Sequence, residues 1–462
     1  MKRAFQKAAT SLALIVIVAI GVRVAFAWVQ ARKIAKIAPG ALGVVPFQQE
    51  TGNIAYALAQ GKGFSNVFRT ETGPTAWLAP VYPLIVAATF KLFGVFTARA
   101  FLACVALNIL FSLAACVPIF FVGKRVGGLG VAAGAAWLWA VFPTGVMMPF
   151  EWIWDTSLST LLAALLLWAT LELAELERWL DWAVYGVLWG LALMTNPALG
   201  LLLPFLLGWA ALRGRGESSM RWKRAGLAAG LAILCCLPWT VRNYVAFHRF
   251  IPVRSNLPFE LWLGNNDIFD ERARGGRRSI TRTEEARRYA QLGETGYMAE
   301  KWELATSFIA AHPRLELQLA GRKFVDFWMG TESPVKNFRD TDSWLIRGIL
   351  LSSFLTAVGA LCGVVVLLVE TKKITQRRRV RGAGAETDES IDEAEEVASL
   401  PVLPLAVFPL VFPCLYYLTH ADLRYRHPID PIVLLLTVIG VWGVFQKGRV
   451  QYGSKVVNHS DS

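Results

Sequence analysis

Long apolar segments alternate with short polar ones over most of the chain. A helix needs roughly 20 apolar residues to cross the bilayer hydrocarbon, and a helix satisfies its own backbone hydrogen bonds there. The segments that we predict to cross a membrane lie near residues 9–28, 98–122, 128–147, 154–174, 182–197, 199–212, 225–241, 345–369, 402–418 and 430–445. The pattern therefore predicts an all-α polytopic membrane protein with about 10 transmembrane helices. Met1–Val29 has a basic start but no convincing small-residue cleavage site, so we expect it to be retained as the first helix.

The basic residues of the short loops predict the orientation of these helices. Clusters of Lys and Arg lie at Lys2 and Arg3, Lys124 and Arg125, Arg213–Arg224, Lys372–Arg381, and Lys447 with Arg449. An even number of spans puts both termini and all of these clusters on one side, which we expect to be the cytoplasm. The net charge of +13 is then a property of membrane topology, and we predict no nucleic-acid partner.

The segment Trp77–Gly94 is apolar but carries Pro80 and Pro83 near its start. If it crossed the membrane, every later loop would change sides and the basic loops would face outward, against the positive-inside rule. We therefore expect a juxtamembrane helix that lies at, or dips into, the outer face. A true span remains the alternative.

The polar stretches divide the chain into regions. We expect an N-terminal membrane module (1–241) with its first outer loop at 30–97, an extracytoplasmic loop domain of roughly 100 residues (242–344), a single transmembrane helix (345–371), a cytoplasmic linker (372–399), a C-terminal helix pair (400–446) and a cytoplasmic tail (447–462). The linker changes from basic to acidic and has almost no apolar content, which is typical of disorder.

Composition agrees with a membrane protein, since 55% of the residues are hydrophobic and only 18% are charged. The six cysteines fall in apolar spans without metal-binding spacing, so we interpret them as small core residues. No phosphate-binding glycine loop, HExxH or GxSxG pattern is present. Any activated donor should therefore reach this protein through the membrane.

A short charged island, from His420 to Asp430, separates the apolar segments Pro401–Leu418 and Pro431–Phe445. Arg and His side chains at a membrane face are costly unless an anion meets them. The arginine fork suits phosphate oxygens and lipid head groups. We predict that this island binds a lipid-linked phosphate, with the candidate ligands Arg424, Tyr425, Arg426 and His427.

Acidic residues collect near the predicted outer edge of the membrane. Glu50 and Glu71 lie in the first outer loop, and Glu151 and Asp155 lie where the fourth span begins. The last two share one helical face because they are four positions apart. A carboxylate in such a place can act as a general base or hold a metal, although acids are also common at helix starts. We take Glu50 and Asp155 as candidate catalytic residues and Glu71 and Glu151 as candidate substrate ligands. No cofactor is required, and a divalent cation is left open.

Several motifs together resemble a known superfamily. They are Glu50 before Ile54–Gly61, Trp77–Leu84 with Phe90–Gly94, Trp154-Asp155, Arg424-Tyr425-Arg426-His427-Pro428, Pro238–Tyr244 and Leu261–Asn266. In order and sidedness they resemble the GT-C superfamily of integral-membrane glycosyltransferases. Within it, the chain resembles bacterial relatives of the dolichyl-phosphate-mannose–protein mannosyltransferases (glycosyltransferase family 39) and of the aminoarabinose transferases. The resemblance covers about residues 1–345 and 400–446.

The resemblance implies a polyprenyl-phosphate-linked sugar donor, inversion at the anomeric carbon and an active site on the outer face of a bacterial inner membrane. It implies a lipid, glycan or protein acceptor, and Glu50 as the general base. One departure concerns the first loop, where the family often has two adjacent acids but this chain has Gln49-Glu50. Metal dependence is therefore left open.

The resulting hypothesis is that Arg424 and Arg426, helped by His427, hold the donor phosphate while Glu50 accepts the acceptor proton. Asp155 would orient the acceptor, and the loop domain would select it. The main rival is a transporter or flippase of lipid-linked sugars, but such proteins usually place ionisable residues at mid-membrane, whereas the predicted spans carry almost no internal charge. A catalytically inactive relative with a role in envelope assembly is the second rival.

Overall fold

The computed structural model describes residues 10–37, 47, 49–68, 70–151, 153–267, 282–331, 337–339, 341, 343–381 and 401–457. The helices of the first half are α2 (Leu12–Ile37), α3 (Glu50–Ala59), α4 (Val81–Phe93), α5 (Ala98–Ala114), α6 (Cys116–Val141), α7 (Pro143–Glu151), α8 (Thr156–Leu173), α9 (Trp179–Thr195), η3 (Pro197–Leu202), α10 (Leu203–Arg213) and α11 (Ser218–Phe247). Those of the second half are α12 (Leu257–Gly264), α14 (Arg282–Ala311), α15 (Pro313–Met329), α17 (Trp344–Arg381), α19 (Val402–Val411), α20 (Cys414–Leu418), α21 (Leu423–Arg426), η4 (His427–Ile429) and α22 (Asp430–Val457). Apart from one isolated bridge between Ser65 and Pro74, these described ranges contain no β-structure, which confirms the all-α prediction.

Several helices are suited to a bilayer. Among the described residues, five segments are long and apolar enough to cross it: Leu12–Lys33, Ala98–Val141, Thr156–Leu173, Ser218–Phe247 and Ile346–Lys372. Three further apolar helices are shorter: Val81–Phe93, Pro197–Arg213 and Val402–Leu418. The chain is thus an integral membrane protein with several transmembrane helices, while the expected count of about 10 is not confirmed.

The helix expected to lie at the outer face is short. α4 has 13 residues, equivalent to about 20 Å at the rise of an α-helix, against about 30 Å of hydrocarbon. Its N-terminus is preceded by Pro80, and Pro83 lies in its first turn, where a missing N–H costs nothing. Length alone therefore makes a complete crossing by α4 unfavourable, in agreement with the juxtamembrane prediction.

A tight helical hairpin connects two of the predicted spans. Gly128 takes a φ of 75°, so the two halves of α6 reverse direction at Gly127 and Gly128. The halves then pack very closely, because a Cβ atom built on Gly123 would lie 2.8 Å from the Cα of Ala132. Glycine is needed at both places, once for the turn and once for the contact.

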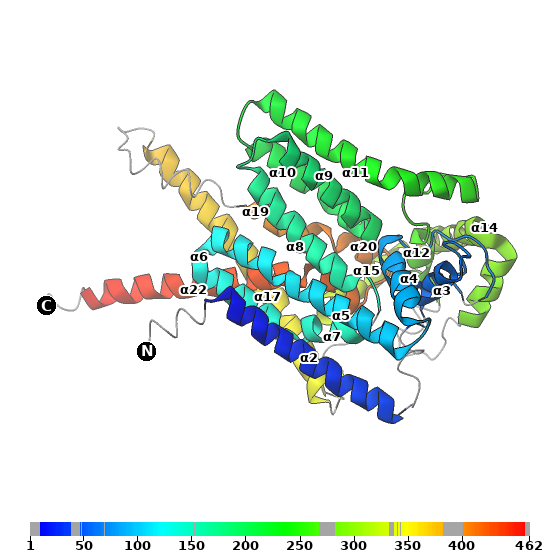
Figure 1. The fold of residues 1–462 in the computed structure, drawn as a ribbon. Coiled ribbons are helices and arrows are strands. Elements are labelled where there is room, and N and C mark those ends of the chain that lie inside the picture. The colour runs from blue at the N-terminus through cyan, green and yellow to red at the C-terminus, as the bar shows by residue number, and fades with distance from the viewer. Residues whose placement is uncertain are drawn as a thin grey trace.

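Ion pairs tie the basic loops together at one end of the molecule. Arg125, beside the hairpin turn, lies 2.9 Å from Glu175 and 3.7 Å from Glu172. Glu175 also lies 2.7 Å from Arg215, which belongs to the connection between α10 and α11. α2 begins and α22 ends at this end of the molecule (Figure 1), while α3, α4, α12 and α14 lie at the opposite end. This separation is the one that the positive-inside rule predicts, and the assignment of the basic end to the cytoplasm stays a prediction.

One buried charge lies inside a predicted span. Arg23 of α2 is fully buried and donates to Ser112 Oγ at 3.1 Å and to the carbonyl oxygens of Trp139 at 3.1 Å and Ala140 at 2.8 Å. A guanidinium that satisfies free carbonyls near the C-terminus of α6 stabilises the packing of α2 on α5 and α6. The span is therefore less free of charge than the sequence analysis assumed.

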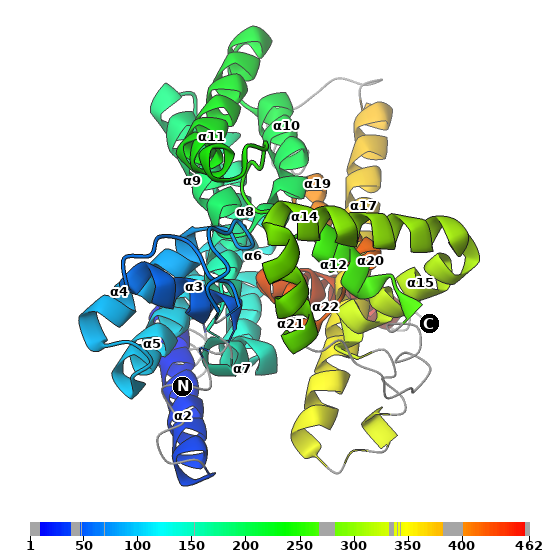
Figure 2. The ribbon, with the colours of Figure 1, turned by 90° about the vertical axis from the view of Figure 1, so that its right-hand side faces the viewer.

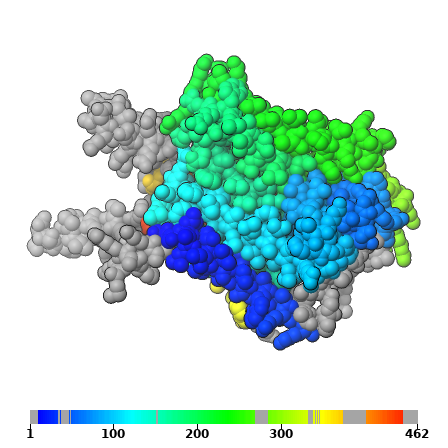
Figure 3. All heavy atoms as spheres, in the orientation of Figure 1, coloured from blue at the N-terminus to red at the C-terminus, as the bar shows by residue number. Residues whose placement is uncertain are grey.

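The surface of the helix bundle is apolar where lipid would meet it. α11 lies along one edge of the molecule, where its side chains are fully in view (Figure 3). Its exposed residues include Ile233, Leu234, Leu237, Val241 and Val245. A row of exposed aliphatic side chains on one helix is typical of a lipid-facing surface.

At the other end, α3 and the segment that follows it lie near α12 and α14 (Figure 2). Glu294 of α14 is buried and accepts four hydrogen bonds. The donors are Thr75 Oγ1 at 2.5 Å, the Ala76 N–H at 2.7 Å, Ser255 Oγ at 2.6 Å and the Tyr289 hydroxyl at 2.6 Å. A buried carboxylate is tolerated when donors saturate it, so Glu294 fixes three separate segments to one another.

Candidate active site

A cavity of about 360 Å³ lies between the membrane helices and the loop domain. Its walls come from the N-terminus of α8, from η3, from the segment that leads into α12, and from the α20–α21 connection. The polar residues of its lining are Asp155, Asn196, Arg254, Asn256, Glu260, Thr419, His420, Arg424 and Tyr425. Its volume lies near the lower end of the range for small-molecule sites, about 300–1,000 Å³.

Five of these residues form a continuous chain of polar contacts, which we call the arginine–carboxylate chain: Arg254, Asn256, Glu260, Tyr425 and Arg424. Arg424 donates to the Tyr425 hydroxyl at 3.0 Å, and Tyr425 lies next to the Glu260 carboxylate, whose pKa it lowers. On the other side, Asn256 donates from Nδ2 to Glu260 Oε1 at 3.1 Å, and the Oδ1 of Asn256 accepts a hydrogen bond from Arg254 Nε. Glu260 is therefore held between the two arginines.

Asp155 is the second carboxyl group of the cavity. It lies immediately before α8 and accepts a hydrogen bond from Ser159 Oγ at 2.9 Å. Burial raises the pKa of Asp155 above its ordinary value, while Ser159, Arg254 and Arg424 act in the opposite direction. The charge of Asp155 is thus coupled to both arginines of the chain, and its raised pKa is what a general base needs.

Glu260 was not among the residues that the sequence analysis selected. Burial raises the pKa of Glu260, and the negative charge of Glu50 raises it further, against the lowering effect of Arg254 and Arg424. Glu50 begins α3 and lies outside the cavity lining, but this coupling places it within electrostatic range of Glu260. The structure therefore brings Glu50, Asp155 and Arg424 into one electrostatic environment and adds Glu260 to it.

The sequence stretch Leu261–Asn266 explains how Glu260 reaches the cavity. α12 lies so close to the α20–α21 connection that a Cβ on Gly264 would stand 1.7 Å from the Thr419 carbonyl oxygen. Asn265 Nδ2 donates to the Leu418 carbonyl at 2.8 Å, and Lys323 donates to the same carbonyl at 3.2 Å. The Leu261–Asn266 motif directly follows Glu260 in the sequence and could have drawn attention to it. Only the tertiary contacts of the motif show that it positions Glu260 at the cavity.

We expect Gly264→Ala to destabilise the protein, because the added methyl group must push α12 away from Thr419. Overpacking of this kind costs about 1–3 kcal/mol. Thermal unfolding in detergent would measure it as a lower midpoint. The matched control is Gly321→Ala in α15, where a Cβ would meet nothing within 4 Å, so stability should stay the same or rise slightly. Equal midpoints for the two variants would contradict the proposed close contact.

Of the charged island, Arg424 and Tyr425 reach the cavity. The Arg424 guanidinium lies 3.8 Å from the ring centre of Trp154, which is a cation–π arrangement. Tyr425 stacks on Tyr416 with ring centres 4.8 Å apart. Aromatic packing therefore fixes both side chains at the wall of the cavity.

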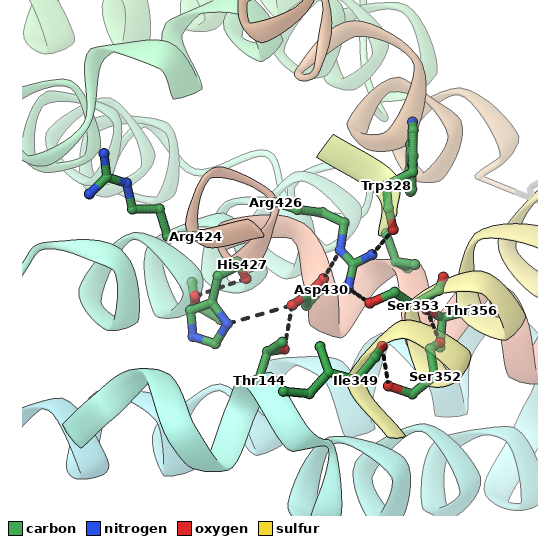
Figure 4. Close-up of polar contacts among 12 residues, drawn as sticks. Thr144, Trp328, Ile349, Ser352, Ser353, Thr356, Arg424, Arg426, His427 and Asp430 are labelled. Atoms are coloured by element: carbon green, nitrogen blue, oxygen red, sulfur yellow. Dashed lines mark hydrogen bonds and ion pairs between the residues drawn. The ribbon is translucent and has the colours of Figure 1, made fainter. Parts of the chain in front are cut away.

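Arg426 and His427 take positions that differ from the expected ones. Both are fully buried outside the cavity lining (Figure 4). Arg426 Nε donates to Asp430 Oδ1 at 2.7 Å, and its other nitrogens reach Ser353 Oγ and the Trp328 carbonyl. His427 Nδ1 lies 3.5 Å from Asp430 Oδ2. Arg424 and Arg426 are two positions apart in a helix, so their side chains point to nearly opposite sides.

Of the two remaining candidates, Glu71 does not line the cavity. It is exposed and lies 2.6 Å from Lys62, whose hydrogen bond lowers the pKa of Glu71. Glu151 is the last residue of α7, and its side chain lies outside the described part of the chain, so the prediction for Glu151 falls outside the described residues.

The described residues contain no group of three or more His, Cys, Asp or Glu side chains that could hold a metal ion. The cavity instead offers Arg254 and Arg424 as its positive groups. Two guanidinium groups in one cavity are well suited to an anion with several oxygen atoms, such as a phosphate.

Part of the chain matches the sequence model of a known family. The sequence model of the dolichyl-phosphate-mannose-protein mannosyltransferase family matches residues 77–241, a segment that includes Trp154 and Asp155. The match confirms the resemblance to GT-C membrane glycosyltransferases that the motifs indicated. No curated protein matches the chain at a significant level.

Two solved structures are similar in arrangement. One is the oligosaccharyltransferase AglB from Archaeoglobus fulgidus in complex with an inhibitory peptide and a dolichol-phosphate, with 11% sequence identity and a TM-score of 0.45 over 89% of this chain. The other is the Archaeoglobus fulgidus oligosaccharyltransferase in the apo form, with 12% identity and a TM-score of 0.45 over 95% of this chain. The chain spans 48% and 52% of these two proteins, about half of their length.

Proposed function

We propose that this protein is a membrane glycosyltransferase that moves a hexose or pentose from a polyprenyl-phosphate donor to a lipid, glycan or protein acceptor, with inversion. The transfer would take place at the outer face of a bacterial inner membrane. The observation that carries the proposal is the single cavity where Arg424, Asp155 and Glu260 meet, in a chain whose residues 77–241 match a mannosyltransferase family.

The cavity has a polar and an apolar side that fit the two parts of such a donor. Leu201 and Leu257 line it and are 38% and 47% exposed, and Leu415 lies on the same side. An isoprenyl chain would leave along this apolar wall toward the lipid, while its phosphate meets Arg424. The donor would then enter from the bilayer without crossing water.

The reaction requires a base for the acceptor and a partner for the leaving phosphate. A carboxylate, Glu50 or Asp155, would take the proton as the acceptor oxygen or nitrogen forms its bond to the anomeric carbon. The bond from that carbon to the phosphate oxygen breaks, and the phosphate leaves with the electron pair. Arg424 stabilises the charge that the phosphate gains in the transition state, which is the largest contribution available in such a site.

The proposal is tested by transfer of radiolabelled sugar from synthetic polyprenyl-phosphate sugars in proteoliposomes. Glu50→Gln and Asp155→Asn keep the size of each side chain but remove the base. The variant of the true base should lose about 10²–10⁴ in rate. Glu303→Gln, an exposed change on α14, is the matched control and should keep full activity.

Three outcomes would contradict the proposal. Full transfer by both Glu50→Gln and Asp155→Asn would remove these acids from the mechanism. Movement of intact donor across the bilayer, with no release of polyprenyl phosphate, would favour a transporter. A protein that neither transfers nor transports any donor of a broad panel would favour an inactive relative.

A further inference from the structure

Glu260 occupies a place that an anionic ligand would normally take. Its Oε1 accepts from Asn256 at 3.1 Å and lies 3.9 Å from Arg254 Nη2, while Tyr425 connects it to Arg424. The side chain is only 20% exposed, although it lines an open cavity. The carboxylate of Glu260 thus offsets part of the positive charge of the two arginines that the proposed donor would need.

The arginines cannot easily follow Glu260 if it moves. Ser255, next to Arg254, donates its N–H to the Ala76 carbonyl at 2.8 Å and its hydroxyl to Glu294 at 2.6 Å. Arg424 is fixed against Trp154. Arg254 Nε also donates to Asn256 Oδ1, so each positive group keeps a partner other than Glu260. Another anion can take over the contact that Glu260 makes with Arg254.

Charged and titratable groups from every neighbouring element act on Glu260. Those coupled to it directly are Glu50 from α3, Arg254 before α12, and Tyr416, Arg424 and Tyr425 from the α20–α21 region. Asp155 and His420 also line the cavity, and Asp422 lies 3.9 Å from Arg424. α14, which packs against α12, carries Glu285, Glu294 and Lys301. Lys301 is paired with Glu285 at 2.7 Å and lies over the Trp262 ring, so its charge is directed away from the cavity. The groups that determine the ionisation of Glu260 are thus Glu50, Arg254 and Arg424.

We propose that Glu260 is an exchangeable internal anion: a phosphodiester binds between Arg254 and Arg424 in its place, and Glu260 takes up a proton as the phosphodiester binds. The identity of this phosphodiester as a polyprenyl-phosphate sugar rests on the proposed function. Arg254 becomes a second phosphate ligand, which sequence analysis did not select.

The exchange balances charge without forming or breaking a bond in the ligand. In the free protein, Glu260 carries the negative charge beside the arginines. In the complex, the phosphodiester carries it, and Glu260 is neutral with a proton taken from water.

The direction of the pH effect follows from linkage. Burial already raises the pKa of Glu260 in the free protein, and a bound phosphodiester raises it further, because a second anion lies beside it. The complex therefore binds more protons than the free protein, and affinity must fall as pH rises between the two pKa values of Glu260. A phosphodiester itself does not titrate in this range, so the change belongs to the protein.

The test is binding of a prenyl methyl phosphodiester to the full-length protein in nanodiscs, followed by tryptophan fluorescence at about pH 5.5 and about pH 8.5. Affinity of the wild type should fall by at most about tenfold per pH unit, the limit for one proton. Glu260→Gln should bind roughly tenfold more tightly than the wild type at the higher pH and should lose the pH dependence. Arg254→Gln should weaken binding at both pH values, and Glu303→Gln should follow the wild type.

The result that overturns this inference is a wild-type affinity independent of pH, or a Glu260→Gln variant that keeps the wild-type pH profile. Thermal unfolding shows whether each variant is folded. If Glu260→Gln is not folded, Glu260→Asp takes its place. This variant keeps an ionisable group and should keep the pH dependence of binding. A pH-independent affinity of Glu260→Asp would again overturn the inference.

Transfer activity separates the two proposals, because pH-dependent binding without transfer counts against the glycosyltransferase alone. Transfer with pH-independent binding counts against the Glu260 exchange alone.

Discussion

Arg424→Gln is expected to lower sugar transfer by about 10²–10³, because it removes the group that meets the leaving phosphate. Arg424→Lys should recover only part of this loss, since an ammonium keeps the charge but lacks the planar fork that matches phosphate oxygens and stacks on Trp154. The measurement is kcat/KM for the polyprenyl-phosphate donor in proteoliposomes.

The control for this prediction is Arg99→Gln, an exposed arginine at the start of α5. It changes net charge by the same amount outside the cavity and should transfer normally. Wild-type kcat/KM for Arg424→Gln would show that the phosphate is held elsewhere, and Arg254 would be the next residue to test.

Arg426→Met is expected to have its largest effect on stability. The change leaves Asp430 buried, 1% exposed, without the guanidinium that lies 2.7 Å from it. Breaking a buried ion pair by removing one partner costs about 3–5 kcal/mol. Thermal unfolding in detergent should show a much lower midpoint than for Arg424→Gln, whose side chain lines an open cavity.

A double variant separates the contribution of the Arg426–Asp430 ion pair to stability from that of its surroundings. Replacing Arg426 by Met and Asp430 by Leu removes both charges, and apolar substitution of a whole buried pair is often neutral. The double variant should therefore be more stable than Arg426→Met. If the single variant unfolds like the wild type, or if the double variant is the least stable of the three, Arg426 does not have the structural role described here.

The fold was predictable to the extent that bilayer physics determines it. Hydropathy and basic loops predict helices, a turn near residues 122–128 and a common side for Arg125 and Arg215, which the structure joins through Glu175. The number of spans was harder to predict, because segments such as Val402–Leu418, which we expected to cross, are apolar but short for a bilayer. Hydropathy measures composition, whereas crossing also needs length.

Among the candidate site residues, only those whose position is set by the start or end of a helix could be predicted from the sequence. Asp155 begins a helix at the membrane edge, and its position follows from the pattern alone. The direction of Arg426 depends on the rotation of a helix of four residues, which no periodicity defines. Glu260 is brought to the cavity by the contact of Gly264 with Thr419, a tertiary contact between distant parts of the chain that cannot be derived from local sequence.

The hydrogen bonds of Glu294 have a consequence for how the protein is made. The Ala76 N–H and its acceptor on Glu294 are 218 residues apart in the chain. At about 5–20 residues per second, the ribosome needs roughly 10–40 s to extend the chain from one to the other. During that interval the segment around Ala76 lacks the acceptor that later buries it. The half of the protein that holds α3, α4 and α14 must therefore remain open until α14 has been synthesised, so incomplete chains depend on the cell to shield this segment.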